Sequence, residues 1–110
     1  MRPVQTADVT SVAVSAPLVL DPRGFVSPTA LELIISGVLT AKVQYTNDDV
    51  FASGFNAATA NWFDHPTLVS KTASDNGNFA VPITAVRLNV TAYTSGKAYL
   101  RVIQSSTGGV

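Results

Sequence analysis

The sequence contains no cysteine among its 110 residues and only one histidine. The absence of cysteine excludes a disulfide framework and a thiolate metal site, and it fits a chain that folds in a reducing cytosol. A single histidine, His65, would need several carboxylates to complete a zinc site, and no second candidate base exists for a hydrolase triad. We therefore interpret His65, between Asp64 and Pro66, as a structural turn residue, and we expect no enzymatic activity.

Charged side chains are also scarce. They make up 13% of the chain, about half the usual share, and seven basic residues balance seven acidic ones. So sparse and balanced a set of charges cannot form the basic stripe that binds a nucleic-acid backbone, and we expect no nucleic-acid partner. Asp48 and Asp49 are interpreted as a solvated turn, with a loop calcium site as the alternative.

Long hydrophobic runs are missing as well. Glu32, Pro17 and Gly37 interrupt the apolar stretches within about ten residues, well short of the roughly 20 that span a bilayer. The segment 12–20 also contains Pro17 and has no small-residue cleavage site after it, so we predict no signal peptide and a mature chain that begins near Met1. The glycines are isolated or terminal and form no phosphate-binding loop, so no cofactor is expected.

Valine and threonine are abundant, and β-branched residues favour strands over helices. Apolar and polar residues alternate over residues 38–46, 84–92 and 97–104, which is typical of strands with one buried face. The residues expected to face the core are Leu39, Ala41, Val43, Tyr45, Val86, Leu88, Val90, Ala92, Ala98, Leu100 and Val102.

Two turns are predicted from their composition. The sequence Thr-Ser-Gly at 94–96 predicts a hairpin between the last two alternating segments. The sequence Asp-Asn-Gly-Asn at 75–78 predicts a second hairpin, which joins residues 67–72 to residues 79–81.

Other strands are expected at residues 11–20, at an edge or bent at Pro17, and at residues 31–36. Gly37 is interpreted as a bulge or bend between two strands. Residues 47–61 read as a loop with one helical turn, after which residues 61–69 return to the sheet.

These elements predict an all-β fold of six to eight short strands. Two packed antiparallel sheets, a β-sandwich or jelly-roll, are expected because a single open sheet would leave an apolar face in water. We place this domain at residues 11–104, with an N-terminal arm at 1–10 and a C-terminal tail at 105–110.

Four segments carry a resemblance to a known class of proteins. They are VQYTNDDV at 43–50, FNAATANWF at 55–63, FAVPITAVRLNVTA at 79–92 and LRVIQ at 100–104. Together they resemble small virion structural proteins of tailed bacteriophages, of the capsid decoration or cement type, over about the last two thirds of the chain.

The resemblance implies a non-enzymatic protein of the virion, on the capsid surface, made in the host cytoplasm. Its partners would be the major capsid protein, whose subunits it would bridge and stabilise, and further copies of itself in a dimer or trimer. The alternative is a carbohydrate-binding or host-attachment module of a phage tail or fiber, with Trp62 and Phe63 as an exposed aromatic platform.

Two contact surfaces are predicted. The N-terminal arm is expected to add a strand to a neighbouring sheet edge; its candidate contact residues are Pro3, Val4 and Val9. The outer face of the predicted last hairpin is the second surface; its candidate residues are Arg87, Tyr93, Tyr99, Arg101 and Ile103.

Overall fold

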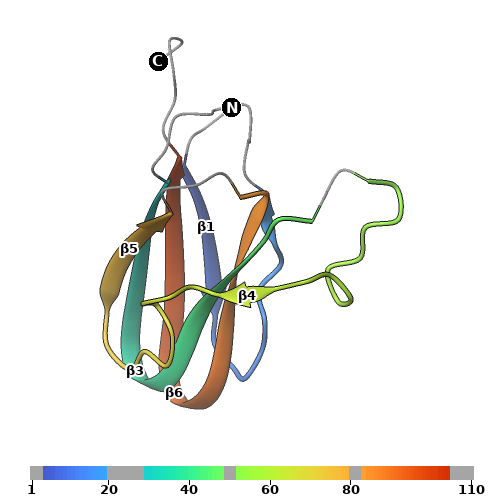
Figure 1. The fold of residues 1–110 in the computed structure, drawn as a ribbon. Helices are drawn as coiled ribbons and strands as arrows, with labels where there is room; N and C mark the ends of the chain where they lie inside the picture. Colours follow the sequence, from blue (N-terminus) through green and yellow to red (C-terminus); the bar gives the residue numbers. More distant parts are fainter. Residues whose placement is uncertain (1–3, 20–28, 49–51, 80–82, 105–110) are drawn as a thin grey trace.

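A computed structural model describes residues 4–19, 29–48, 52–79 and 83–104, and these residues form an all-β fold without a helix. The strands, shown in Figure 1, are β1 (Val4–Val9), β2 (Leu18–Val19), β3 (Thr29–Thr46), β4 (Phe63–Asp64), β5 (Asp75–Phe79) and β6 (Ala85–Gln104). The predicted all-β class is confirmed.

All six strands belong to one antiparallel sheet in which β3 and β6 lie at the centre. These two strands pair along their whole lengths, from Thr29 opposite Gln104 to Thr46 opposite Ala85. β1 and β2 flank β6, while β4 and β5 flank β3. The described residues therefore form one continuous sheet, and they do not divide into the two separate sheets that the sequence predicted.

Both central strands bend sharply at the same level, so that the two halves of the sheet face each other (Figure 1). Gly37 lies opposite Gly96 at this bend, with φ angles of 94° and 86°. A Cβ atom on Gly37 would lie 2.5 Å from the carbonyl oxygen of Ser95, and one on Gly96 would overlap the carbonyl oxygen of Ser36. Only glycine permits both the positive φ and this close backbone approach.

The bend corrects the predicted hairpin at residues 94–96. Residues 84–92 and 97–104 do not pair with each other, because β6 pairs with β3 on both sides of Gly96. A glycine with positive φ suits a hairpin turn and also a bend in paired strands. The local sequence therefore led us to pair residues 84–92 with residues 97–104, whereas both segments pair with β3. The predicted bend at Gly37 is confirmed, although residues 31–36 and 38–46 are one strand.

The second predicted hairpin, at residues 75–78, is also wrong. Residues Asp75–Phe79 form β5, in which Gly77 lies opposite Leu31. A Cβ atom on Gly77 would lie 3.2 Å from Cε1 of His65 and 3.3 Å from Cδ1 of Leu68. This glycine therefore allows a close approach of side chains to an extended strand, and it does not form a turn.

Two further strand predictions are only partly confirmed. Residues 67–72 form no strand; they reach β3 through a bridge between Lys71 and Ala41 and through a hydrogen bond of 2.9 Å from the backbone nitrogen of Val43 to the carbonyl oxygen of Leu68. Of the described residues 11–19, only β2 and an isolated bridge at Val14 pair with β6, and Pro17 precedes β2. Residue 20 lies outside the described residues. Residues 80 and 81 of the predicted strand 79–81 lie outside the described residues.

The hydrophobic core lies between the two halves of the bent sheet, and its membership confirms the predicted alternation except at Ala92, which is exposed, and Tyr45, which is half-buried. Each fully buried Val or Leu side chain contributes about 1.5–3 kcal/mol of transfer free energy. The buried core residues are Val9, Leu31, Leu33, Leu39, Ala41, Val43, Leu68, Ile83, Val86, Leu88, Val90, Ala98, Leu100 and Val102.

The N-terminal segment belongs to the sheet, which corrects the predicted free arm. β1 pairs with residues 98–103 of β6, and Val9, opposite Ala98, is buried. The apolar and polar residues of this segment alternate only weakly, but it still forms a strand because residues 98–103 of β6 supply backbone hydrogen-bond partners along its whole length. Residues 1–3 and the predicted tail 105–110 lie outside the described residues.

Substitution of Gly96, one of the two glycines at the bend, should strongly destabilise the folded protein. We expect Gly96→Ala to cost about 3 kcal/mol or more, because the methyl group overlaps backbone and the φ is unfavourable. Gly54→Ala is the matched control, since a Cβ there meets nothing within 4 Å. Urea unfolding followed by circular dichroism measures both, and equal stabilities for the two variants would contradict this role of the bend.

Deletion of residues 2–10 should lower the free energy of unfolding. The deletion removes β1 and the buried Val9 side chain, and it exposes the edge of β6 at residues 98–103 to pairing with other chains. Thermal unfolding should show a lower midpoint, and size-exclusion chromatography should show self-association. An unchanged midpoint would show that β1 is dispensable to the domain.

Candidate functional site

The bend divides the outward side chains of β3 and β6 into two separate surfaces. On the half of the sheet that contains β1 and β5, Glu32 lies opposite Arg101 and Ile34 lies opposite Tyr99. We name this surface the tyrosine face; it consists of Glu32, Ile34, Lys97, Tyr99, Arg101 and Ile103.

The tyrosine face combines an organised ion pair with exposed aliphatic side chains. Arg101 Nη1 lies 2.9 Å from Glu32 Oε1, and its guanidinium carbon lies 5.5 Å from the centre of the Tyr99 ring. The Tyr99 hydroxyl and then the Glu32 carboxylate raise the pKa of Arg101. Ile34 and Ile103 remain 40% and 42% exposed. Tyrosine, arginine and isoleucine side chains in this arrangement suit a protein contact.

The predicted contact residues do not form one surface. Tyr99, Arg101 and Ile103 share the tyrosine face, and β1 places Val4 opposite Ile103. Val9 is buried in the core and Pro3 lies outside the described residues.

Arg87 and Tyr93 lie apart from the tyrosine face, because both precede the bend at Gly96 on β6. Arg87 belongs to the other half of the sheet. The Tyr93 hydroxyl donates a hydrogen bond of 2.8 Å to the carbonyl oxygen of Gly96, and its ring packs against the core.

A polar network centred on Gln44 occupies the outer surface of the other half. The Gln44 amide nitrogen donates to Asp64 at 3.0 Å, while its oxygen accepts from Arg87 Nε at 2.8 Å and from Asn89 Nδ2 at 3.2 Å. Lys42 pairs with Asp64 at 3.2 Å. Pairing of β4 with β3 sets Asp64 opposite Gln44, which is only 8% exposed. The network therefore fixes β4 to the sheet.

The surroundings in this network shift the pKa values of Asp64 and Arg87. The hydrogen bond from Gln44 has the largest effect on the pKa of Asp64 and lowers it; burial opposes this effect, and the hydrogen bond and charge of Lys42 lower the pKa further. Burial lowers the pKa of Arg87. The Arg87 guanidinium lies 4.3 Å from the centre of the Trp62 ring, in a cation–π contact.

The two aromatic residues of the predicted carbohydrate platform differ in exposure. Trp62 is half-buried, its ring is covered on one side by Arg87, and its Nε1 donates to the carbonyl oxygen of Ala57 at 2.9 Å. Phe63 is 52% exposed, with its ring 5.8 Å from that of Tyr45. Trp62 is thus engaged within the chain and does not present two free ring faces.

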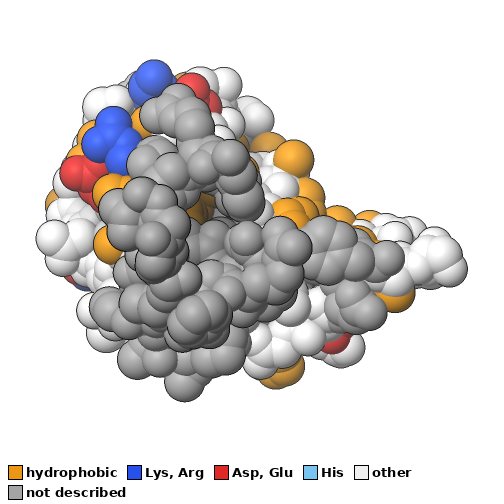
Figure 2. All heavy atoms as spheres, turned by 90° about the horizontal axis from the view of Figure 1, so that it is seen from above, with side chains coloured by type: hydrophobic (Ala, Val, Ile, Leu, Met, Phe, Trp, Pro, Cys, Tyr) orange, Lys and Arg blue, Asp and Glu red, His pale blue; other side chains and the backbone are white. Residues whose placement is uncertain are grey.

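Residues 52–61 project away from the sheet (Figure 1), and we name them the projecting loop. Figure 2 shows the loop from above as a protrusion of mostly uncharged atoms. The sequence has no Lys, Arg, Asp or Glu from residue 50 to residue 63. Within the loop, the Asn56 side chain accepts from the backbone nitrogen of Ala58 at 2.9 Å, and its carbonyl accepts from that of Thr59 at 3.1 Å. These bonds close a turn at residues 56–59, and the hydrogen bond of 3.0 Å from the backbone nitrogen of Phe55 to the carbonyl oxygen of Ala52 closes a second. Neither turn is a helix, so the predicted helical turn is replaced by two hydrogen-bonded turns.

The base of the projecting loop is closed by Asp48 and Asn61. Asp48 Oδ2 accepts a hydrogen bond of 2.9 Å from the backbone nitrogen of Asn61, and the Asn61 amide contacts both carboxylate oxygens at 3.3 Å. Asp49, the other half of the alternative calcium site, lies outside the described residues. Within the described ranges, no three His, Cys, Asp or Glu side chains gather at one point.

His65 has a structural environment, as the sequence predicted. Its Nδ1 accepts from the backbone nitrogens of Thr67 and Leu68, both at 3.1 Å. Because backbone nitrogens only donate, Nδ1 is unprotonated, and Nε2 carries the hydrogen that is donated to the carbonyl oxygen of Asn78 at 2.9 Å. The ring therefore links the segment after β4 to β5.

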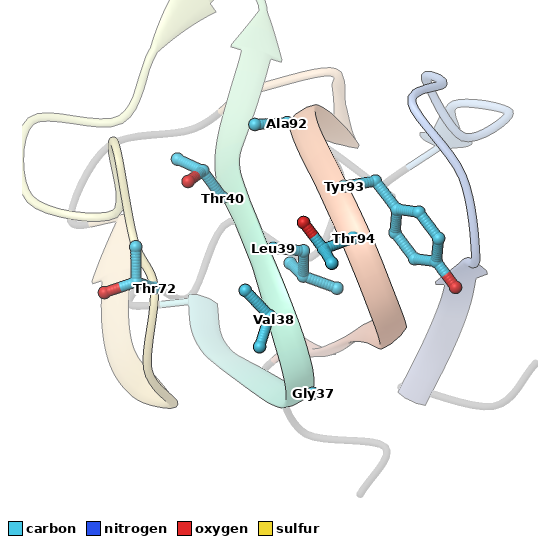
Figure 3. Close-up of a pocket in the computed structure, with 8 residues that line it drawn as sticks. All are labelled: Gly37, Val38, Leu39, Thr40, Thr72, Ala92, Tyr93 and Thr94. Carbon is cyan, nitrogen blue, oxygen red and sulfur yellow. The ribbon is translucent and has the colours of Figure 1, made fainter.

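A hollow of about 260 Å³ lies beside the bend. In Figure 3, the Tyr93 ring extends from β6 on the side away from Thr72, and its hydroxyl donates to the carbonyl oxygen of Gly96. The lining side chains offer methyl and hydroxyl groups and carry no charge; the lining residues are Gly37, Val38, Leu39, Thr40, Thr72, Ala92, Tyr93 and Thr94.

No protein-family model, curated protein or solved structure matches this chain. Within the described part of the chain, no helix is present that could span a membrane.

The sequence predicted a loop at residues 47–61, but it predicted neither the projection of residues 52–61 from the sheet nor the role of Gln44. The uncharged stretch at residues 50–63 is visible in the sequence, but composition does not give the direction in which a loop leaves the sheet. Gln44 had no local signal, since its partners lie on β4 and β6.

Acid should remove a contribution of Asp64 to stability. The pKa of Asp64 is lowered in the folded state from its ordinary value of 3.8. The contribution is therefore present above that value and is lost as the pH falls through the lower, folded-state pKa. The Asp64 carboxylate is 45% exposed, so we expect less than about 1 kcal/mol, reduced further by salt.

Asp64→Asn should flatten the dependence of the free energy of unfolding on pH below pH 3.8. Urea unfolding at several pH values measures this dependence, and NMR titration of the wild-type carboxyl gives the pKa directly. A titration at or above the ordinary value would contradict the role of the Gln44 hydrogen bond.

Proposed function

We propose that this protein is a non-enzymatic structural protein of a tailed-bacteriophage virion, of the capsid decoration type, which bridges and stabilises major capsid subunits. The observation that carries the proposal is that one bent sheet supports two separate surfaces suited to protein contacts, the tyrosine face and the projecting loop. A protein that bridges two neighbours needs two such surfaces held at a fixed separation.

The tyrosine face supports a contact with a protein neighbour. Tyrosine and arginine are enriched at protein interfaces and among the residues that contribute most to binding. The pairing of Arg101 with Glu32 orders the arginine before binding, and Ile34 and Ile103 supply apolar area on either side.

The stiffness of the scaffold supports a bridging role. Two central strands of 18 and 20 residues run through both halves of the sheet, so force applied to one surface passes through a continuous hydrogen-bonded ladder to the other. The sequence resemblance at residues 43–50, 55–63, 79–92 and 100–104 supports a phage capsid as the assembly in which such a bridge would act.

The proposal predicts where the chain is found in virions. Heads and tails separated from purified particles of the phage that carries the sequence should show an 11.5 kDa band in the heads. Recombinant protein added to undecorated shells should bind to saturation and raise the temperature at which the shells disrupt. A band that follows the tails, or shells that neither bind nor gain stability, would overturn the proposal.

A further inference from the structure

We infer that the projecting loop is the part of this protein that inserts into the capsid shell, where it occupies an uncharged recess formed by major capsid subunits. The inference rests on the proposed function and adds to it the segment that docks and the chemistry of its receptor.

The composition of the loop fits an uncharged recess. All fourteen charged side chains of the protein, seven basic and seven acidic, lie outside residues 50–63. Insertion of this segment therefore removes no charge from water, which avoids the largest cost of burying a surface loop. Gly54, Ala57 and Ala58 permit close approach of the loop backbone, while asparagine, serine and threonine side chains supply adaptable hydrogen bonds.

The loop is ordered before it binds. Asn56 closes its turn, Asp48 and Asn61 close its base, and Trp62 Nε1 holds the carbonyl oxygen of Ala57. A segment already held in one conformation loses less entropy on docking than a free one, so more of the contact energy appears as affinity.

The loop is also connected to the sheet through side chains. Trp62 lies beneath the Arg87 guanidinium, and Arg87 donates to the nearly buried Gln44 on β3. The indole therefore fixes the loop relative to the strands that carry the tyrosine face. This connection gives Trp62 a positioning role.

Two matched charge substitutions test the inference. Ala58 is an exposed residue of the projecting loop, and Ala73 is an exposed residue of the segment before β5. We expect Ala58→Glu to weaken binding to undecorated shells tenfold or more, because a carboxylate would enter the recess, and Ala73→Glu to bind as the wild type does. Circular dichroism should show both variants folded.

Two further measurements test whether the position of the projecting loop matters for shell binding. Trp62→Phe keeps a ring beneath Arg87 but removes the donor to Ala57, and should weaken shell binding by a smaller factor. Hydrogen exchange of the wild-type protein on shells should slow at residues 52–61. This readout does not require any variant to fold.

The outcomes separate the inference from the proposed function. If the wild type fails to bind shells, both are wrong. If it binds while Ala58→Glu binds equally well and exchange at residues 52–61 is unchanged, the loop inference is wrong and the proposed function stands. If Ala58→Glu abolishes self-association but leaves shell binding intact, the loop contacts a second copy of this chain, which also overturns the inference.

Discussion

The close approach of Gly37 and Gly96 is the constraint on which the remaining structure depends. Without a bend at this pair, strands of 18 and 20 residues would form a long ribbon with one apolar face in water. With the bend, the alternating Val and Leu residues of both halves face one another and form a core. Register shifts between Val38 and Leu39 and between Thr40 and Ala41 lie next to the bend, where they increase the local twist.

Much of the fold follows from short-range patterns, and its connectivity does not. Alternation identified the inward residues of both long strands because side-chain period is a local property. The two hairpins were mispredicted because glycine is required both by turns and by close packing. Gly96 meets Gly37 and Gly77 meets His65, and these partners lie far away in the sequence. The local sequence shows that a glycine is present, but it does not show which distant residue packs against that glycine.

The same limit applies to the candidate surfaces. Tyr99, Arg101 and Ile103 were grouped correctly because they alternate along one uninterrupted segment of β6. Arg87 was grouped with them only through the predicted hairpin, and the real path of β6 places it beside Trp62 on the other half. The direction of the projecting loop depends on the pairing of β4 with β3 and on the Arg87–Trp62 contact, which no local pattern reveals.

The central position of β6 has a consequence for how the chain folds. Both β1 and β3 find their main partner in this last strand, so most of the sheet cannot form until residues 85–104 have left the ribosome. Pairing of β3 with β6 must also close the segment between them, 47–84, which costs entropy before any ladder forms. High contact order of this kind slows folding. Until β6 joins, the apolar faces of the earlier strands are open to aggregation, and chaperone binding would be most useful in that interval.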